Sequence, residues 1–392
     1  MSTESKSRIL CLSAYHASSH QHWTQTLSQG LQDYTWAFLT LPPRHFRWRI
    51  RGNPLSWLDE PLLREPWDLI IATSMVDLAT LRGLHPSLAQ VPVLLYCHEN
   101  QFFYPTRNPA KHHSNEPAMV TLYSALSADQ VLFNSAFNRD TFIAGAEGLM
   151  GQLPDHLPAQ LGERLRARSG VLPVPLEPAA FAATGQQPGD PDPGRWGDSG
   201  TDPIRVVWAA RWEYDKGPER LLAVVRELEA MGVNYRLCVL GESFRQCPGA
   251  FHEIAEEIPH RLAQFGHVAD RCEYYHWLRS AHLVLSTSLH EFQGLAVLEA
   301  MACGCLPVLP DRLVYPEQVA DSYRYPSVDE AGFARDSTLE AKGAAALIVQ
   351  LGNQCLAGKG LVPDVGPFSW GALAKRYKAQ IEQTMARGRQ PL

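Results

Sequence analysis

Residues 282–304 read HLVLSTSLHEFQGLAVLEAMACG, and the order of their properties decides the fold class. An apolar run at 282–287 is followed by a polar turn containing Glu291 and Gly294, and then by an amphipathic run at 295–302. A short apolar run before a turn and a helix-length segment is typical of a strand that leads into a helix. The stretch therefore predicts one strand–helix unit of a parallel sheet.

The same alternation continues on both sides of this stretch. In the second half of the chain it predicts strands at 205–210, 236–240, 282–287 and 306–309, and helices at 218–231, 250–263 and 295–302. In the first half it predicts, less clearly, strands at 8–13, 36–41, 68–73, 93–97 and 130–134, and helices at 20–31, 116–127 and 136–146. We expect two α/β domains, each a doubly wound parallel sheet covered by helices.

The domain limits follow from composition. Residues 185–203 are crowded with Gly, Pro and Asp and have almost no large apolar residue apart from Trp196, which predicts a flexible linker. Ser369 is a candidate N-cap for a final helix whose apolar stripe must dock, and this helix could pack back on the first domain. The predicted divisions are 1–184, 185–203, 204–367 and 368–392.

Composition narrows the class of protein. The chain has 392 residues, 45% of them hydrophobic, which is enough for two cores. A net charge of −6 argues against nonspecific coating of nucleic acid, although it leaves room for a local basic patch. The apolar run at 9–13 is too short for a signal peptide or a membrane span, and the eight cysteines have no paired spacing. We expect a cytoplasmic protein with reduced thiols and no membrane partner.

Two charged clusters stand where strands give way to helices. In the segment 209–217, AARWEYDKG, Arg211 and Lys216 could both point at one diphosphate near a helix start. The alternative is a pair of solvated surface charges.

The second cluster is the stretch quoted first. Glu291 and Glu299 are separated by seven residues, so in a continuous helix they would lie two turns apart on one side of a ligand. Gly294 would let the amides of 293–295 approach phosphate or sugar oxygens. The alternative is a capping glutamate and an ordinary surface glutamate.

Together, Arg211, the pair Lys216–Gly217 and the stretch from Glu291 to Gly304 resemble the donor-binding half of the retaining glycosyltransferases of family 4. The resemblance implies the GT-B fold, with two Rossmann-like domains facing each other across a cleft. Arg211 and Lys216 would then hold the donor diphosphate. Glu291 would contact sugar hydroxyls, and Glu299 would accept hydrogen bonds from the ribose. The other donor-binding positions that it implies are Gly241, His267, Val268, Gln293, Gly294 and Leu295.

The first half resembles the tRNA-queuosine mannosyltransferases within that family. The resemblance rests on 96–101, YCHENQ, with Tyr104 and Pro105 downstream, and is supported by 18–20, 47–52 and 133–138. The group tends to have glycines before the first-turn histidine, whereas this chain has Ala-Ser-Ser at 17–19, which argues against close backbone approach at that turn. By the resemblance His98 lies beside the donor sugar, and catalysis would rest on His98, Arg211, Lys216 and Glu291. The implied acceptor-binding residues include His20, Glu99, Asn100, Gln101 and Arg107.

Basic and aromatic residues interleave before Gly52, in a segment that we expect to be a loop. Arg47, Arg49 and Arg51 alternate with Trp48 and others, as single-stranded RNA requires, because guanidinium groups pair with phosphates and aromatic faces stack on bases. We expect these four residues to bind the acceptor. The alternative is a loop whose tryptophan packs in the core.

The resemblance implies retaining transfer of mannose from GDP-mannose to the queuosine base of tRNA, in particular at the anticodon wobble position of the aspartate tRNA. Such enzymes are thought to use front-side attack, so no protein nucleophile is nominated. We expect no cofactor and no metal, since the single close Asp-x-Asp, Asp190 to Asp192, lies in the linker. Composition distinguishes neither GDP from UDP nor one hexose from another, and it does not give the oligomeric state.

Two alternatives stay open. One is an enzyme of the same family that acts on a lipid or polysaccharide acceptor, although the first half has no convincing basic amphipathic helix. The other is a catalytically inert tRNA-binding relative, against which the intact charged clusters speak.

Overall fold

The structure is a computed structural model, and it describes residues 6–103, 115–154, 160–182, 196–197, 202–243, 247–327 and 337–388. The chain forms two compact units, one made of Met1–Pro175 with Phe368–Leu392 and the other of Leu176–Pro367. The first unit ends at Pro175, before the predicted limit at 184, and it includes the final helix. Arg107 lies outside the described residues.

Trp196, in the predicted linker, is a core residue of the second unit. Its side chain is buried, its indole N–H donates to Ser280 Oγ at 2.9 Å, and its ring lies edge-on to Trp277. The composition of 185–203 does not predict this burial, because one tryptophan contributes little to an average over many Gly, Pro and Asp residues.

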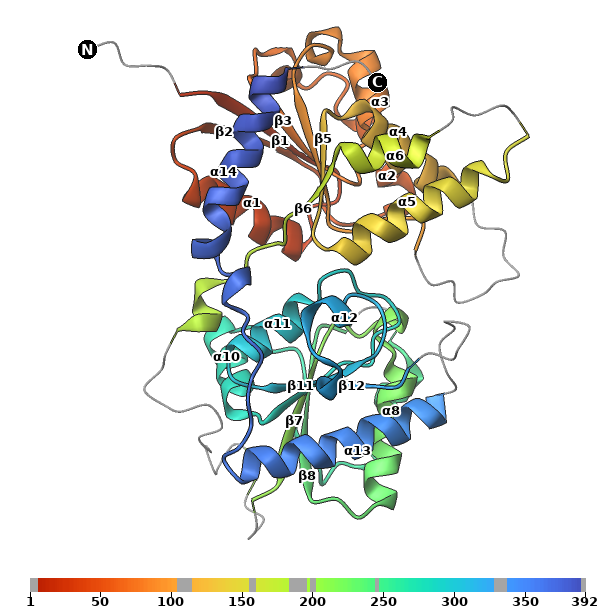
Figure 1. Cartoon of the computed structure of the whole chain (residues 1–392), viewed down its shortest axis with the longest axis vertical. Helices are drawn as coiled ribbons and strands as arrows, with labels where there is room; N and C mark the ends of the chain where they lie inside the picture. Colours follow the sequence, from red (N-terminus) through yellow and green to blue (C-terminus); the bar gives the residue numbers. More distant parts are fainter. Residues whose placement is uncertain are drawn as a thin grey trace. The chain divides into compact units, whose positions relative to one another are not determined.

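The first unit contains a six-stranded parallel sheet in the order β2-β1-β3-β4-β5-β6 (Figure 1). Its strands are β1 (Arg8–Ser13), β2 (Thr35–Thr40), β3 (Leu69–Thr73), β4 (Val93–Cys97), β5 (Gln130–Phe133) and β6 (Ser169–Val171). The helices are α1 (Ser18–Gly30), α2 (Phe46–Ser56), α3 (Leu78–Leu84), α4 (Glu116–Ser127), α5 (Ala136–Met150), α6 (Leu161–Ala167) and α14 (Trp370–Arg387). Every residue of β3 and β4 is buried, as expected for strands covered by helices on both faces.

The second unit repeats the plan with the order β12-β11-β10-β7-β8-β9. Its strands are β7 (Ile204–Ala209), β8 (Tyr235–Leu240), β9 (Leu262–Gly266), β10 (Leu283–Leu285), β11 (Leu306–Pro310) and β12 (Arg324–Tyr325). Its helices are α8 (Pro218–Ala230), α9 (Gly249–Glu257), α10 (Arg271–Ser280), α11 (Leu295–Ala302), α12 (Tyr315–Gln318) and α13 (Ser337–Leu356). Two parallel doubly wound sheets confirm the expected α/β fold of each unit.

The final helix, α14, belongs to the first unit. Ser369 caps it by accepting a hydrogen bond from the backbone N–H of Ala372, as the sequence predicted. The stripe Leu373, Tyr377 and Ile381 is buried, and α14 packs against α1, β3 and β4 (Figure 1). In the described part of the chain, no helix is long and apolar enough to cross a membrane.

Candidate active site

The donor half of the predicted site lies at the carboxyl edge of the second sheet. β7 and β10 are neighbouring parallel strands, so the loops that follow them emerge side by side. Hydrogen bonds join these two loops directly. The backbone N–H groups of Leu289 and His290 donate to the carbonyl of Asp215 at 2.8 and 3.1 Å, and Thr287 Oγ1 donates to the carbonyl of Lys216 at 2.9 Å.

Gly217 makes this close approach possible. Its backbone has a φ of 66°, and a Cβ atom at this position would lie 2.1 Å from the carbonyl oxygen of Thr287. Any other residue would be strained and would push the loops apart. Gly241 plays a similar part after β8, because a Cβ there would lie 1.8 Å from the carbonyl of Ala210.

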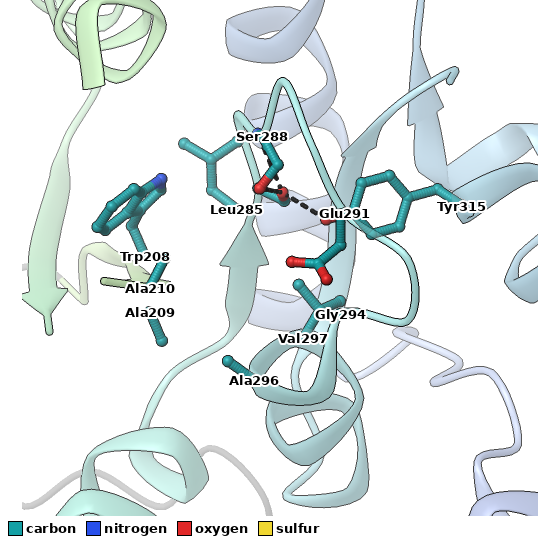
Figure 2. A pocket seen from close by; sticks show the side chains of 11 residues that line it. Trp208, Ala209, Ala210, Leu285, Ser288, Glu291, Gly294, Ala296, Val297 and Tyr315 are labelled. Atoms are coloured by element: carbon teal, nitrogen blue, oxygen red, sulfur yellow. Dashed lines mark hydrogen bonds between the residues drawn. The ribbon is translucent and has the colours of Figure 1, made fainter. Parts of the chain in front are cut away.

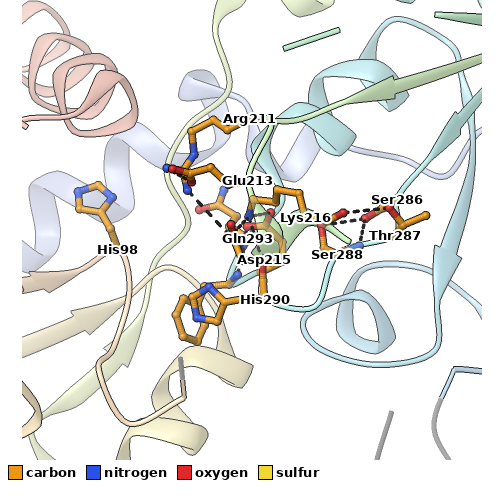
Figure 3. A network of polar contacts seen from close by, with 12 residues as sticks. His98, Arg211, Glu213, Asp215, Lys216, Ser286, Thr287, Ser288, His290 and Gln293 are labelled. Atoms are coloured by element: carbon orange, nitrogen blue, oxygen red, sulfur yellow. Dashed lines mark hydrogen bonds and ion pairs between the residues drawn. The ribbon is translucent and has the colours of Figure 1, made fainter. Parts of the chain in front are cut away.

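Lys216 is the centre of a buried ion-pair cluster (Figure 3). Its ammonium donates to the carbonyl of His290 at 3.0 Å and to Glu291 Oε2 at 3.2 Å, and it lies 3.2 Å from Asp215 Oδ2. Burial acts to lower the pKa of Lys216, but the carboxylates of Glu291 and Asp215 raise it above its ordinary value. Lys216 is therefore a fixed positive charge.

Glu291 is ionised in the same cluster. Burial acts to raise its pKa, but Lys216 and the backbone N–H of Gly294 together hold the pKa below its ordinary value. Its Oε1 also accepts the N–H of Phe292 at 3.2 Å and lies 3.5 Å from the N–H of Gln293, so this carboxylate caps the turn before α11.

The helix predicted at 295–302 is confirmed, so Glu291 and Glu299 do not share one continuous helix. Gly294 has a φ of 70° and interrupts the chain before α11 begins at Leu295. Glu291 therefore belongs to the turn, and Glu299 alone belongs to the helix.

Arg211 is the exposed member of the charged set. Half of its side chain (53%) is accessible to solvent, and its Nη1 lies 2.6 Å from Glu213 Oε2. Nη2 lies 4.0 Å from Asp215 Oδ2. The cluster as a whole thus places two cations, Arg211 and Lys216, among three carboxylates.

Glu299 is held by residues that the sequence analysis missed. Its Oε1 accepts from Arg271 at 2.9 Å and from the Tyr275 hydroxyl at 3.2 Å, while Oε2 accepts from the Tyr274 hydroxyl at 3.0 Å. Spacings of three and four residues put these side chains on one face of α10, and this pattern could have identified them as a group. His267 and Val268 follow β9 at the same edge of the sheet, where His267 is exposed.

A small pocket of about 20 Å³ lies beside Glu291 (Figure 2). It is lined by Trp208, Ala209, Ala210, Leu285, Ser286, Ser288, Glu291, Gly294, Ala296, Val297 and Tyr315. The Tyr315 hydroxyl lies 2.7 Å from Ser286 Oγ, which in turn donates to Ser288 Oγ at 3.2 Å. Tyr315 was not predicted, because its contact with Ser286 spans 29 positions and follows no local pattern.

In the first unit, His98 and His20 form a stacked pair at the carboxyl ends of β4 and β1. Their ring centroids are 4.0 Å apart at 20°, and both side chains are buried. Burial lowers the pKa of His20 to about 3, with a further contribution from His16. Burial, then His20, also holds the pKa of His98 well below its ordinary value. Both imidazoles are therefore neutral, and His98 Nε2 has no hydrogen-bond partner among the described residues.

Asparagines hold the backbone around His98. Asn134 Nδ2 donates to the carbonyl of His98 at 2.8 Å, and Asn138 Nδ2 donates to the carbonyl of Cys97 at 3.0 Å. Asn100 is fully buried, and its amide is occupied by Asn138, Thr141 and the N–H groups of 102 and 103. These hydrogen bonds give Asn100 a structural role, and they occupy the amide that was predicted to contact the acceptor. Glu99 and Gln101, on either side of it, are half-buried.

The predicted arginine-rich loop is wrong, because its residues form α2. Ile50 and Asn53 give the helix one buried face, which the sequence analysis overlooked beside the charges. Arg47 and Trp48 are exposed, the latter at 54%, and Arg49 is half-buried.

Arg51, unlike Arg47, is bound to other side chains of the first unit. Its guanidinium forms an ion pair with the buried carboxylate of Asp77 and donates to Thr80 Oγ1 at 3.0 Å. The structure therefore brings the donor residues together, whereas it divides the predicted acceptor residues into exposed and buried groups. Among the residues described, no group of three or more His, Cys, Asp or Glu side chains is placed to hold a metal ion.

Comparison with known proteins gives matches over both units. Residues 8–176 match the family model described as tRNA-queuosine alpha-mannosyltransferase N-terminal, and residues 197–351 match that of the glycosyl transferases group 1. The tRNA-queuosine alpha-mannosyltransferase of Drosophila melanogaster is 32% identical over 317 residues, which cover 80% of this chain and 81% of the fly protein.

Solved structures show the same fold at low identity. Anabaena Alr3699/HepE in complex with UDP has a TM-score of 0.60 and 14% identity, with 96% of this chain and 100% of that chain covered. A glycosyltransferase from Rickettsia africae has a TM-score of 0.58 and 12% identity, with 97% and 99% covered.

Proposed function

The chain belongs to the tRNA-queuosine alpha-mannosyltransferase family of glycosyltransferases, and from this premise we propose its donor, its acceptor and the residues that serve each. The donor is GDP-mannose, and the acceptor is the queuosine base of tRNA, at the wobble position of the aspartate tRNA anticodon. Since both are expected in the cytoplasm, the reaction takes place there.

The fixed ammonium of Lys216 is the observation that carries the proposal. Departure of a nucleoside diphosphate builds negative charge on the leaving phosphate, and this charge is best met by cations already in place. Asp215 and Glu291 hold the ammonium of Lys216 before the donor arrives. Lys216 binds one phosphate of the donor diphosphate. Arg211, which is more exposed, leaves Glu213 and binds the other phosphate.

The remaining donor contacts follow the geometry of the second unit. Glu291 is ionised beside Gly294 and accepts hydrogen bonds from hydroxyls of the sugar. Glu299 accepts one hydrogen bond from the ribose with the lone pair of Oε2 that Arg271, Tyr274 and Tyr275 leave unused, because a carboxylate has about four acceptor positions.

The transfer needs no protein nucleophile. The acceptor hydroxyl oxygen forms the new bond to the sugar's anomeric carbon while the bond from that carbon to the leaving phosphate oxygen breaks, on the same face. The acceptor proton passes to the departing phosphate oxygen, so the configuration is retained. His98, neutral and with Nε2 unpaired in the described part of the first unit, accepts a hydrogen bond from a sugar hydroxyl and orients it. Arg211 and Lys216 supply the positive charge, so we propose neither a metal nor a cofactor.

The tRNA contacts the exposed face of α2. Arg47 is exposed and pairs with phosphate, and the exposed ring of Trp48 stacks on an unpaired base of the anticodon loop. Trp48 is held for this purpose against Gly52, where an added Cβ would meet its indole at 2.5 Å.

The testing experiment is transfer of label from radioactive GDP-mannose to total tRNA from cells that make queuosine and from cells that do not. We expect label only on the queuosine-containing tRNA. UDP-glucose, UDP-galactose and UDP-mannose serve as matched donors. Label on both tRNA preparations would contradict the acceptor, transfer from a UDP-sugar alone would contradict the donor, and silence of all donors would contradict both.

A further inference from the structure

Tyr377 on α14 joins three parts of the first unit that are distant in sequence. Its side chain is 2% exposed, and its hydroxyl lies within hydrogen-bond distance of three groups. It donates to the carbonyl of Pro173 at 2.8 Å, accepts from the indole N–H of Trp23 at 3.0 Å, and lies 3.3 Å from the Tyr96 hydroxyl. The Tyr96 hydroxyl in turn donates to the carbonyl of Leu172 at 2.8 Å.

The two aromatic rings bound by Tyr377 form the walls around His98. Trp23 and Tyr96 stack on each other with centroids 4.3 Å apart. Trp23 lies edge-on to the His98 ring at 5.0 Å and 88°, and Tyr96 does so at 4.7 Å and 61°. His20 stacks on the imidazole from another direction. The orientation of the His98 ring is therefore determined by three rings, two of which are tied to one hydroxyl.

We propose that Tyr377 is a positioning residue for the transfer reaction, which fixes the imidazole of His98 by holding Trp23 and Tyr96. The proposal rests on the role given to His98 above. Without the hydroxyl, the Trp23 indole N–H and the Pro173 carbonyl lose their partner, and both rings can tilt. A tilt of the imidazole misplaces the atom that orients the sugar hydroxyl, and small misplacements of reacting groups cost large factors in rate.

The test uses Tyr377→Phe, which removes the hydroxyl and keeps the ring. We expect kcat to fall about tenfold and the KM for GDP-mannose to change by less than about twofold, since the diphosphate and ribose contacts lie in the second unit and the substitution disturbs the single contact from His98 to the sugar. The matched control is Thr384→Val, on the same helix, which removes a buried hydroxyl that donates to the carbonyl of Gln380, within the helix itself, at 2.7 Å. This control is expected to keep the wild-type kcat.

A double-mutant cycle separates positioning from stability. In a His98→Gln background, Tyr377→Phe should change kcat by less than about twofold, because the group it positions is already gone. An unchanged kcat in Tyr377→Phe, or a tenfold loss that persists in the His98→Gln background, would overturn the proposal. A wild-type kcat in His98→Gln alone would overturn the role of His98 itself, and with it the positioning role. Should Tyr377→Phe fail to fold, Trp23→Phe removes the indole donor from the same hydroxyl, and we expect it to give the same cycle.

Discussion

The carboxyl ends of the two sheets have the same topology but differ in the charge of the residues buried there. In the second unit Lys216 lies among carboxylates, and its ammonium is charged. In the first unit His98 and His20 are buried with aromatic rings, and both are neutral. Under the proposed function, the difference gives one fold two tasks, because a leaving diphosphate requires fixed charge, while a sugar hydroxyl requires an oriented hydrogen-bond acceptor.

The supporting residues behind each site follow the same contrast. Behind the cluster around Lys216, Arg312, whose side chain is 8% exposed, donates to the carbonyl of Ser288 at 3.0 Å and contacts Glu340 at 2.5 Å. Glu340 in turn pairs with Arg220 on α8 at 2.7 Å. Behind the first site, the neutral amides of Asn134 and Asn138 hold the backbone at 97 and 98. Ion pairs thus fix one loop and amide hydrogen bonds fix the other.

The largest effect is expected for Lys216→Met. The substitution keeps the aliphatic chain and leaves the carboxylates of Asp215 and Glu291 without their buried cation. We expect transfer to fall by a factor of about 10³ and the free energy of unfolding to fall by about 3–5 kcal/mol. Transfer assays and denaturant unfolding measure the two effects, with Lys342→Met, at an exposed position of α13, as control. Wild-type turnover in Lys216→Met would show that the buried charge of Lys216 is not needed for transfer, and the contrast between the two units would then have no functional meaning.

How much of this contrast the sequence predicts depends on the range of the contacts. Most strands and the charged turns were predicted because a strand end and the turn after it are local, and the stretch 209–217 contains Arg211 and Lys216 together. The strands β6, β9 and β12 were missed, and the helix predicted at 250–263 ends at Glu257, before β9. Arg271 and Tyr274 were missed, since their contacts with Glu299 span 28 and 25 positions.

Two features of the sites depend on a backbone conformation that the sequence did not reveal. The relative placement of Glu291 and Glu299 was not predicted, because the left-handed conformation of Gly294 before α11 cannot be read from the spacing of the two glutamates. The segment around Trp48 was predicted to be a loop because its charges concealed the buried face that Ile50 and Asn53 give to α2. In both cases backbone conformation depends on what the tertiary structure packs against it.

A second prediction tests whether the imidazoles of His20 and His98, in the first unit, are neutral. Because the pKa of His20 is lowered to about 3 in the folded protein, the unfolded chain binds a proton below about pH 6.5 that the folded chain does not. Stability is therefore lost as pH falls from 6.5 toward 3, at about 1.4 kcal/mol per pH unit for this histidine. Between pH 7 and pH 5, His20→Asn should lose about 2 kcal/mol less free energy of unfolding than wild type.

Denaturant unfolding at the two pH values measures this difference, with His252→Asn as the exposed control. Equal losses in His20→Asn and wild type would show that His20 accepts a proton in the folded protein. The first site would then carry charge under mild acid, and the contrast with the second site would be weaker than the structure indicates.

The smallest effect is expected on the surface of the first unit, where Arg47 and Arg51 offer a matched pair on α2. Arg47 is exposed, whereas Arg51 is bound to Asp77 and Thr80. Arg47→Ala should weaken tRNA binding a few-fold and reduce the slope of log K against log salt by about 0.7, the value for one phosphate contact on a single strand. Arg51→Ala should leave that slope unchanged and lower stability instead. Binding titrations at several salt concentrations distinguish the two variants. Equal slopes would show that the ion pair between Arg51 and Asp77 opens when RNA binds. Both arginines of α2 would then contact phosphate, and their different surroundings in the free protein would not matter for binding.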